Sequence, residues 1–244
     1  MPGITDMHCH ILPGLDDGCK DMEETMDVLR EAQRQQIRHI IVTPHFHPGR
    51  YEVDAFQVKE VLQKVQEQCR KDGIDVILHP GQECYYYSEL VSLLDQRKVL
   101  TLAESRYVLV EFEPDCPFHA MLTGLQELKQ SGYFPIVAHF ERYGCLRKEE
   151  KLIELKERGY LLQMNYDRVR EKDGIFRKNP WRKLLKAGVV DYLGSDCHGT
   201  GFRPLHVEEA YQWMRENLPV SLRKRILVDH IKNIIESTDK DYGE

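Results

Sequence analysis

The chain has 244 residues, of which 41% are hydrophobic and 30% charged, and its formal net charge is −6. This length fits one large α/β domain that buries about 70–75% of its unfolded surface, so we expect a single domain over residues 1–244. The acidic balance argues against nucleic acid as a partner, because that function needs a basic surface. Seven cysteines without a CxxC pair indicate a reducing compartment. With no signal-peptide pattern and no apolar stretch of about 20 residues, we expect a cytoplasmic protein with no membrane span.

Short β-rich segments alternate with longer segments of helical periodicity. In the first helical segment, apolar residues recur every three or four positions, at Met22, Met26, Leu29 and Ala32. A glycine follows four helical segments, where a left-handed residue ends a helix: Gly73, Gly132, Gly159 and Gly188. We expect strands over residues 4–8, 39–43, 75–79, 107–111, 134–139, 160–164 and 189–193. We expect helices over residues 22–36, 54–72, 88–97, 120–131, 148–158, 180–187, 206–216 and 221–237.

This alternation of strands and helices predicts parallel pairing. Continuous apolar runs, such as residues 40–42 and 108–110, fit strands that are buried on both faces. Histidines or acidic residues that could bind metal follow nearly every strand, whereas an open doubly wound sheet gathers its ligands at one switch point. The sequence therefore predicts an α/β fold with a closed or nearly closed barrel.

Two histidines stand at the end of the first predicted strand, in Asp6-Met-His8-Cys-His10. Alternate residues of a strand project to one side about 6.5–7 Å apart, so the two imidazoles can converge on one cation. An HxH pair alone is just as often a pair of core or surface histidines. Similar residues stand at or just past other strand ends, however, namely Asp17, His45, Glu83, Glu111, His139, Asp196 and His198. Because the carboxyl ends of barrel strands form one face, we expect all nine side chains to meet there.

The composition of this set limits the choice of metal. Imidazole and carboxylate ligands without thiolate favour Mn, Fe or Zn over Ca or a structural zinc. Nine ligands are too many for one ion, so we expect two or three divalent ions that share bridging carboxylates. Ions about 3.5–4 Å apart activate a water and hold both oxygens of an in-line phosphoryl displacement. The set therefore predicts a polynuclear phosphoester hydrolase.

Two arginines follow predicted ligands directly. Arg142 lies three residues past His139, and Arg203 lies five past His198 in a glycine-rich loop. A lone loop arginine is most often a surface ion-pair partner. Guanidinium groups match phosphate oxygens bidentately and keep their charge, so we assign these two to a substrate phosphate.

Other residues near the predicted ligands allow two interpretations each. His47 is either close to the substrate or an exposed loop histidine. The consecutive tyrosines Tyr85, Tyr86 and Tyr87 either form a wall for a ring-bearing substrate or pack under a loop, and packing is the interpretation we favour.

In this order, the motifs Asp-Met-His-Cys-His, Asp-Asp-Gly, Thr-Pro-His, Gly-Gln-Glu, Val-Glu-Phe, Ala-His-Phe-Glu-Arg-Tyr and Ser-Asp-Cys-His resemble the PHP (polymerase and histidinol phosphatase) superfamily. With Ile-Leu-Pro-Gly-Leu-Asp-Asp-Gly, the set is most similar to its bacterial protein tyrosine phosphatases of the CpsB/CapC type. That type is associated with capsule and exopolysaccharide clusters. The resemblance covers residues 4–235, nearly the whole chain.

The resemblance implies a distorted (β/α)7 TIM-like barrel, a centre of three ions usually described with manganese, and a metal-activated hydroxide that hydrolyses phosphotyrosine. The partner it implies is a bacterial tyrosine autokinase. By motif, it assigns metal ligation to the same nine residues and phosphate contact to Arg142 and Arg203. One alternative is a small-molecule phosphatase of the histidinol phosphate kind, and another is a non-catalytic docking module. A PHP nuclease is disfavoured because the chain lacks a basic groove.

A rival mechanism comes from Cys197-His-Gly-Thr-Gly-Phe-Arg203, which fits the C-x5-R spacing of cysteine-dependent tyrosine phosphatases. In those enzymes a thiolate attacks phosphorus. The short pattern arises often by accident, and His198 inside it belongs to the predicted metal set. We therefore expect chelation of metal, rather than replacement of Cys197, to abolish activity.

Overall fold

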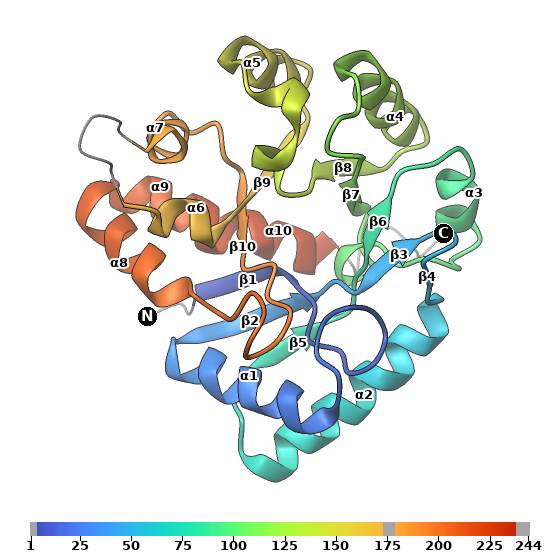
Figure 1. Cartoon of the computed structure of the whole chain (residues 1–244), viewed down its shortest axis with the longest axis vertical. Coiled ribbons are helices and arrows are strands. Elements are labelled where there is room, and N and C mark those ends of the chain that lie inside the picture. The colour runs from blue at the N-terminus through green and yellow to red at the C-terminus, as the bar shows by residue number, and fades with distance from the viewer. Residues whose placement is uncertain (1–3, 173–178, 238–244) are drawn as a thin grey trace.

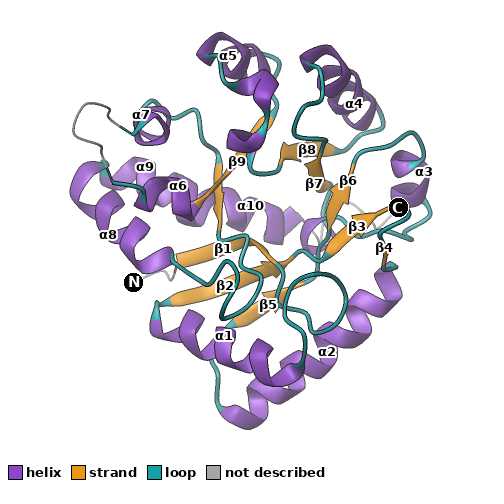
Figure 2. Cartoon of the chain, in the orientation of Figure 1, coloured by secondary structure: helices purple, strands orange, loops and turns teal. Residues whose placement is uncertain are grey.

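The computed structural model describes residues 4–172 and 179–237. Its strands form the centre of the molecule, and its helices lie around them (Figures 1 and 2). The strands are β1 (Ile4–Cys9), β2 (Ile37–Val42), β3 (His45–His47), β4 (Tyr51–Glu52), β5 (Ile77–His79), β6 (Glu83–Tyr85), β7 (Tyr107–Glu111), β8 (Phe134–Val137), β9 (Leu161–Asn165) and β10 (Tyr192–Gly194). The α-helices are α1 (Met22–Arg34), α2 (Ala55–Asp72), α3 (Leu90–Asp95), α4 (Phe118–Gln130), α5 (Glu149–Glu157), α6 (Tyr166–Arg170), α7 (Pro180–Lys186), α8 (Val207–Asn217), α9 (Val220–Lys224) and α10 (His230–Glu236).

Parallel pairing joins the strands into a ring. One sheet has the order β1-β2-β5 and the other the order β10-β9-β8-β7-β6-β3-β4. Among the strand pairs of the described residues, only that of β3 and β4 is antiparallel. The segment after β10 closes the ring on β1, since the Asp196 N–H donates to the His8 carbonyl (2.8 Å) and the His10 N–H to the Cys197 carbonyl (2.9 Å). Counting β2 with β3 and β5 with β6, the described residues form a distorted seven-strand α/β barrel. This confirms the barrel predicted from the strand pattern and the distorted form that the family resemblance implied.

The distortion comes from two strands that break at prolines. β2 continues as β3 after Pro44, and β5 continues as β6 after a segment that begins with Pro80. Proline has no N–H and cannot continue a ladder of hydrogen bonds. Sequence reasoning placed both His45 and Glu83 just past the end of a predicted strand. Both predictions are wrong in this detail, because each residue begins a short strand of its own.

Two hydrophobic clusters fill the fold. The larger one packs the strands against the surrounding helices, and the smaller one lies within the barrel. The smaller cluster consists of Met7, Ile41, Leu102, Ala103, Leu109, Ile136, Ala138, Tyr192, Ile231 and Ile234. The last two belong to α10, which crosses behind the strands in Figure 1. Apolar side chains thus occupy the amino end of the barrel, which leaves the carboxyl end for polar residues.

Most predicted helices are confirmed, with ends that shift by a few residues. α1 begins at the predicted Met22 because Asp21 caps it, with a side chain that accepts from the Glu24 N–H (2.9 Å). All four predicted helix-ending glycines have positive φ. The prediction of one α-helix over residues 221–237 is wrong, because a π-helical turn (Arg225–Asp229) separates α9 from α10. In the described part of the chain, no helix is long and apolar enough to cross a membrane.

Candidate metal centre

The nine predicted ligands lie together at the carboxyl end of the barrel, although they come from both ends of the chain. His8 lies in β1 with His10 just after it, Asp17 lies on the loop before α1, His45 begins β3, Glu83 begins β6, Glu111 ends β7, His139 follows β8, and Asp196 and His198 follow β10. Parallel strands of a barrel present their carboxyl ends on one face. The structure therefore brings together all nine side chains that were predicted to meet because they stand at or just past strand ends.

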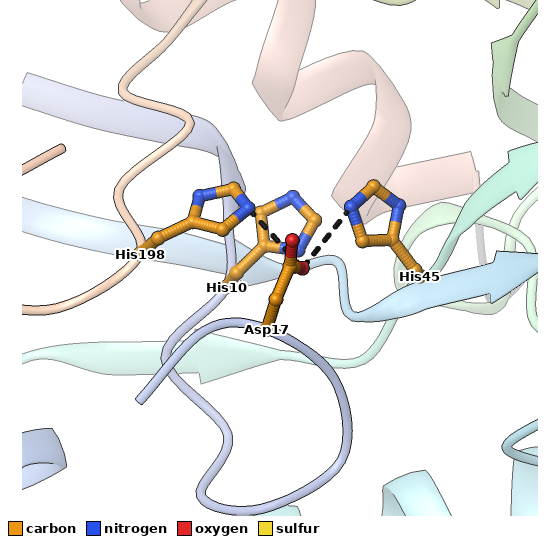
Figure 3. A group of neighbouring side chains, drawn as sticks. All are labelled: His10, Asp17, His45 and His198. Atoms are coloured by element: carbon orange, nitrogen blue, oxygen red, sulfur yellow. Dashed lines mark ion pairs between the residues drawn. The ribbon is translucent and has the colours of Figure 1, made fainter. Parts of the chain in front are cut away.

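Three groups of these side chains could each hold a metal ion, as far as the described residues go. They are His10, Asp17, His45 and His198; His8, His10 and Asp196; and His45, Glu83 and Glu111, with ligand atoms in each group within 4.8 Å of one another. In Figure 3 the three imidazoles of the first group stand in a row, and Asp17 Oδ1 lies 3.5 Å from His45 Nε2 and 3.6 Å from His198 Nε2. Because His10 and His45 each belong to two groups, the groups adjoin.

Glu83 lies at the centre of the cluster. Its buried Oε2 lies 3.1 Å from His45 Nδ1, 3.2 Å from His8 Nε2 and 3.3 Å from His10 Nε2, yet it has no hydrogen-bond partner among the described residues. Its Oε1 lies 2.7 Å from His139 Nε2. Buried polar atoms in proteins are nearly always satisfied. A cation would satisfy this oxygen, so the nitrogen and oxygen donors present fit a transition-metal centre.

Charges in the cluster are strongly coupled. Burial opposes ionisation of Glu83, but the neighbouring imidazoles of His8 and His45 hold its pKa well below its usual range. A hydrogen bond with His198 holds the pKa of Asp17 below its usual range as well. Both carboxyl groups are therefore anionic at neutral pH, which metal ligation requires.

Neighbouring groups orient the imidazoles. His10 Nδ1 lies 2.7 Å from Asp16 Oδ2, and His198 Nδ1 lies 2.8 Å from the backbone carbonyl of Asp196. A hydrogen bond at one ring nitrogen leaves the other nitrogen, with its lone pair, to face the centre. Sequence reasoning chose Asp17 from the Asp-Asp pair and missed Asp16, because two adjacent acids give no signal of which one faces the ligands.

Arg142 and Arg203 both reach Asp196. Arg142 Nη2 forms an ion pair with Asp196 Oδ2, and Arg203 Nη1 lies 3.3 Å from the same oxygen. The two arginine side chains are 28% and 34% exposed, whereas that of Asp196 is buried. Together with other residues they line a cavity of about 200 Å³. The two partly exposed arginines thus lie between the buried carboxylate of Asp196 and solvent.

Two aromatic side chains flank the row of imidazoles. Tyr51 stacks on His45 with ring centroids 5.6 Å apart, and Phe202 meets His198 edge-on at 6.5 Å. Phe202 is 68% exposed, and the Arg203 guanidinium lies 5.0 Å from the centre of its ring. An exposed phenyl ring in this position can contact an aryl group of a substrate.

The three consecutive tyrosines differ in their surroundings. Tyr86 and Tyr87 pack against the larger hydrophobic cluster, and the Tyr86 hydroxyl also donates to Glu127. Packing, the favoured interpretation, is therefore confirmed for these two. Tyr85 packs instead on His47, with ring centroids 4.1 Å apart.

The thiol of the C-x5-R pattern is not placed for nucleophilic attack. The Cys197 side chain is fully buried, and its Sγ donates to the Gly199 carbonyl at 3.5 Å. Reactive cysteines occupy partly exposed, electropositive surroundings. The structure thus disfavours a thiolate mechanism.

A parallel α/β barrel with clustered histidines and carboxylates at the carboxyl ends of its strands is the architecture of a metal-dependent hydrolase. The family model described as "Capsular polysaccharide synthesis, CpsB/CapC" matches residues 4–236. The chain belongs to this family, which confirms what its motifs implied.

Relatives and solved structures agree with this membership. Tyrosine-protein phosphatase CpsB of Streptococcus pneumoniae is 31% identical over 238 residues, which are 95% of this chain and 98% of the relative. Tyrosine-protein phosphatase YwqE of Bacillus subtilis (strain 168) is 34% identical over 212 residues, 85% of this chain and 82% of the relative. A structure from work on these two proteins, described as unique metal-dependent tyrosine phosphatases, has a TM-score of 0.85 at 31% identity and covers 96% of this chain and 95% of its own. A phosphotriesterase homology protein from Escherichia coli shares the fold alone, with a TM-score of 0.59 at 14% identity over 96% of this chain and 98% of its own.

Proposed function

We propose that this chain, a metal-dependent tyrosine-protein phosphatase of the CpsB/YwqE type, removes phosphate from tyrosines of a bacterial autokinase that controls capsule or exopolysaccharide synthesis. The observation that carries the proposal is the cluster of histidines and carboxylates with two arginines beside it, in a chain that belongs to the CpsB/CapC family. We further propose that residues 1–244 act as one domain in the cytoplasm.

The proposed ligands are the nine residues predicted from the sequence: His8, His10, Asp17, His45, Glu83, Glu111, His139, Asp196 and His198. The three adjoining groups support two or three divalent ions rather than one. The donor set suits manganese, which we propose as the native metal, with iron or zinc as the alternatives. When bound, such ions act as Lewis acids and lower the pKa of water towards ~7, so that hydroxide is available at neutral pH.

Side chains around the cluster bind the substrate and stabilise charge during the reaction. Arg142 and Arg203 bind the phosphate oxygens, since guanidinium groups match them bidentately and remain charged. Donors held in place in this way stabilise the charge on the equatorial oxygens during phosphoryl transfer. Phe202 contacts the phenyl ring of phosphotyrosine from its exposed position beside Arg203.

Steady-state hydrolysis of a phosphotyrosyl peptide by the manganese-loaded protein tests this proposal. We expect Arg142→Ala and Arg203→Ala each to lower kcat/KM by about 100-fold, the usual loss when one fixed donor is removed. Exposed Arg147 lies nearby in the sequence, and Arg147→Ala serves as the matched control. Chelation should abolish turnover, whereas Cys197→Ser should leave most of it.

Three outcomes would contradict the proposal. If neither arginine variant slowed turnover, the phosphate contacts would be misassigned. If the protein hydrolysed histidinol phosphate much faster than the peptide, the substrate would be a small molecule. If chelation had no effect and Cys197→Ser abolished activity, the metal mechanism would be wrong.

A further inference from the structure

β9 differs from the other six strand positions of the barrel, because within the described residues it carries none of the proposed ligands. Instead it carries two buried polar side chains, Gln163 (0% exposed) and Asn165 (7% exposed). Residues two apart on a strand project to the same side. Both of these side chains hydrogen-bond to groups of the proposed ligands.

One backbone N–H fixes the direction of every hydrogen bond in this chain of contacts. The His139 N–H can only donate, so the Gln163 atom 2.6 Å from it must be the carbonyl oxygen Oε1. That same oxygen lies 3.1 Å from His8 Nδ1, which must therefore carry a proton and donate as well. His8 Nε2 is then left with its lone pair, and this is the atom that lies 3.2 Å from Glu83 Oε2.

The amide nitrogen of Gln163 extends this series of hydrogen bonds, and the direction of each further bond is fixed. Its Nε2 donates to Asn165 Oδ1 (2.9 Å), which leaves Asn165 Nδ2 to donate to Asp196 Oδ2 (3.0 Å). The Asn165 N–H in turn donates to Glu141 Oε1 (3.1 Å). Two side chains on one strand thus contact proposed ligands from three others, namely His8, His139 and Asp196.

Two of these ligands have strained backbones. His139 has φ 30° and Asp196 has φ 53°, in the left-handed region that residues other than glycine rarely adopt. Such conformations persist only where the surroundings hold them in place. Gln163 bonds to the backbone of His139, and Asn165 bonds to the side chain of Asp196.

Close packing also favours this arrangement. A Cβ atom on Gly194 would lie 2.5 Å from His8 Cβ and 3.1 Å from Gln163 Nε2. The absence of a side chain at this position in β10 therefore lets His8 and Gln163 meet.

We propose that Gln163 and Asn165 are positioning residues of the metal centre, and that Gln163 selects the His8 tautomer whose Nε2 is free to bind metal. This inference rests on the ligand assignment of the proposed function and requires nothing about the substrate. Groups that orient metal ligands typically change metal affinity or activity by 10–100-fold when they are removed.

Calorimetric titration of the metal-free full-length protein with Mn²⁺ tests the proposal. Gln163→Met keeps the size of the side chain and removes its hydrogen bonds, and we expect it to weaken Mn²⁺ binding by about 10–100-fold. Asn165→Leu removes the side-chain hydrogen bonds to Asp196 and to Gln163 Nε2 but keeps both bonds of Gln163 Oε1, and it should have a smaller effect. Because the two residues act in one chain of bonds, the double variant should lose less than the product of the two single losses.

A tautomer measurement separates positioning from general destabilisation. In ¹⁵N NMR spectra of the metal-free protein, His8 should show the Nδ1–H tautomer in the wild type and lose this preference in Gln163→Met. Gln35 provides a matched control, because it is a buried glutamine whose Oε1 accepts from the N–H groups of Val207 and Glu208, away from the cluster. Gln35→Met should lower stability and leave Mn²⁺ affinity unchanged.

Three results would overturn the proposal. They are Mn²⁺ binding by Gln163→Met within twofold of the wild type, an equal loss of affinity in Gln35→Met, and an unchanged His8 tautomer. If Gln163→Met failed to fold, unchanged affinity in Asn165→Leu would be enough to reject the pair. None of these readouts uses a phosphate ester, so failure of the proposed phosphatase activity would be seen separately.

Discussion

Asp16 allows a sharp test of how the charge of a neighbouring carboxylate contributes to the metal centre. Its Oδ2 accepts from His10 Nδ1 (2.7 Å) and the His45 N–H (2.8 Å), and its Oδ1 accepts from the Gly18 N–H (3.0 Å). In Asp16→Asn the backbone N–H of His45 requires the amide oxygen on that side. The amide NH2 then faces the Gly18 N–H, so one buried hydrogen bond is lost while the His10 tautomer is kept.

We therefore expect the two substitutions at this position to differ. Asp16→Asn should lower stability by about 1–3 kcal/mol, the cost of an unsatisfied buried group, and keep most of the metal affinity. Asp16→Ala removes all three acceptors, leaves His10 without a fixed orientation, and should weaken Mn²⁺ binding by about 10–100-fold.

Urea unfolding of the metal-free protein measures the first effect without a contribution from bound metal, and Mn²⁺ calorimetry measures the second. Asp21→Ala is the control, because Asp21 caps α1 and its loss should cost about 0.5–2 kcal/mol with no change in affinity. Equal Mn²⁺ affinities of wild type and Asp16→Ala would refute the reasoning. Equal losses in Asp16→Asn and Asp16→Ala would show that charge, and not tautomer, is what Asp16 provides.

Other substitutions test separate features. Gly194→Ala places a Cβ 2.5 Å from His8 Cβ and should cost about 1–3 kcal/mol in urea unfolding, whereas Gly201→Ala, with nothing within 4 Å, should cost little. Burial lowers the pKa of His79 to about 4, below its ordinary 6.5. Between pH 6.5 and 4, protons therefore bind the imidazole of the unfolded chain in preference to that of the folded one. The free energy of unfolding should fall by about 1 kcal/mol from pH 7 to 5, after allowance for partial exposure. His79→Gln should remove this loss. Phe202→Ala should lower kcat/KM for a phosphotyrosyl peptide by about 3–10-fold and spare a phosphoseryl one; equal losses would argue against ring contact.

Much of the site could be predicted because strand ends of a parallel barrel share one face. His8, Glu111 and Asp196 are far apart in the sequence, yet each lies at or next to the end of a strand whose apolar pattern is clear. The rule needs only the type of each strand and the position of its last residue. Small errors in strand boundaries, such as those at β5 and β10, leave its outcome unchanged.

What the sequence did not reveal depends on side-chain contacts or on very short elements. β3 and β6 have three residues each and follow proline-containing segments, so neither shows a periodicity that pattern analysis can use. Gln163 interrupts the apolar run of β9, and a buried polar residue in such a strand is a signal that could have been read. The hydrogen-bond partners of Gln163 could not be predicted, because His8 in β1 and His139 after β8 are distant from it in the sequence.

The way in which the two sheets end has a consequence for how this protein behaves at high concentration. An unpaired strand edge is a template on which another chain can add, and proteins protect such edges with short or charged strands. Here the longer sheet ends in β4, which has only two residues, one of them Glu52. At the opposite end the backbone after β10 is bonded to β1, and beside β5 the Ala103 N–H donates to the Pro80 carbonyl (2.6 Å). Within the described residues, the strands at the free ends of the two sheets, β4 and β5, have only two and three residues. Such short edges offer other chains little backbone on which to extend a sheet, so the topology opposes aggregation as well as shaping the site.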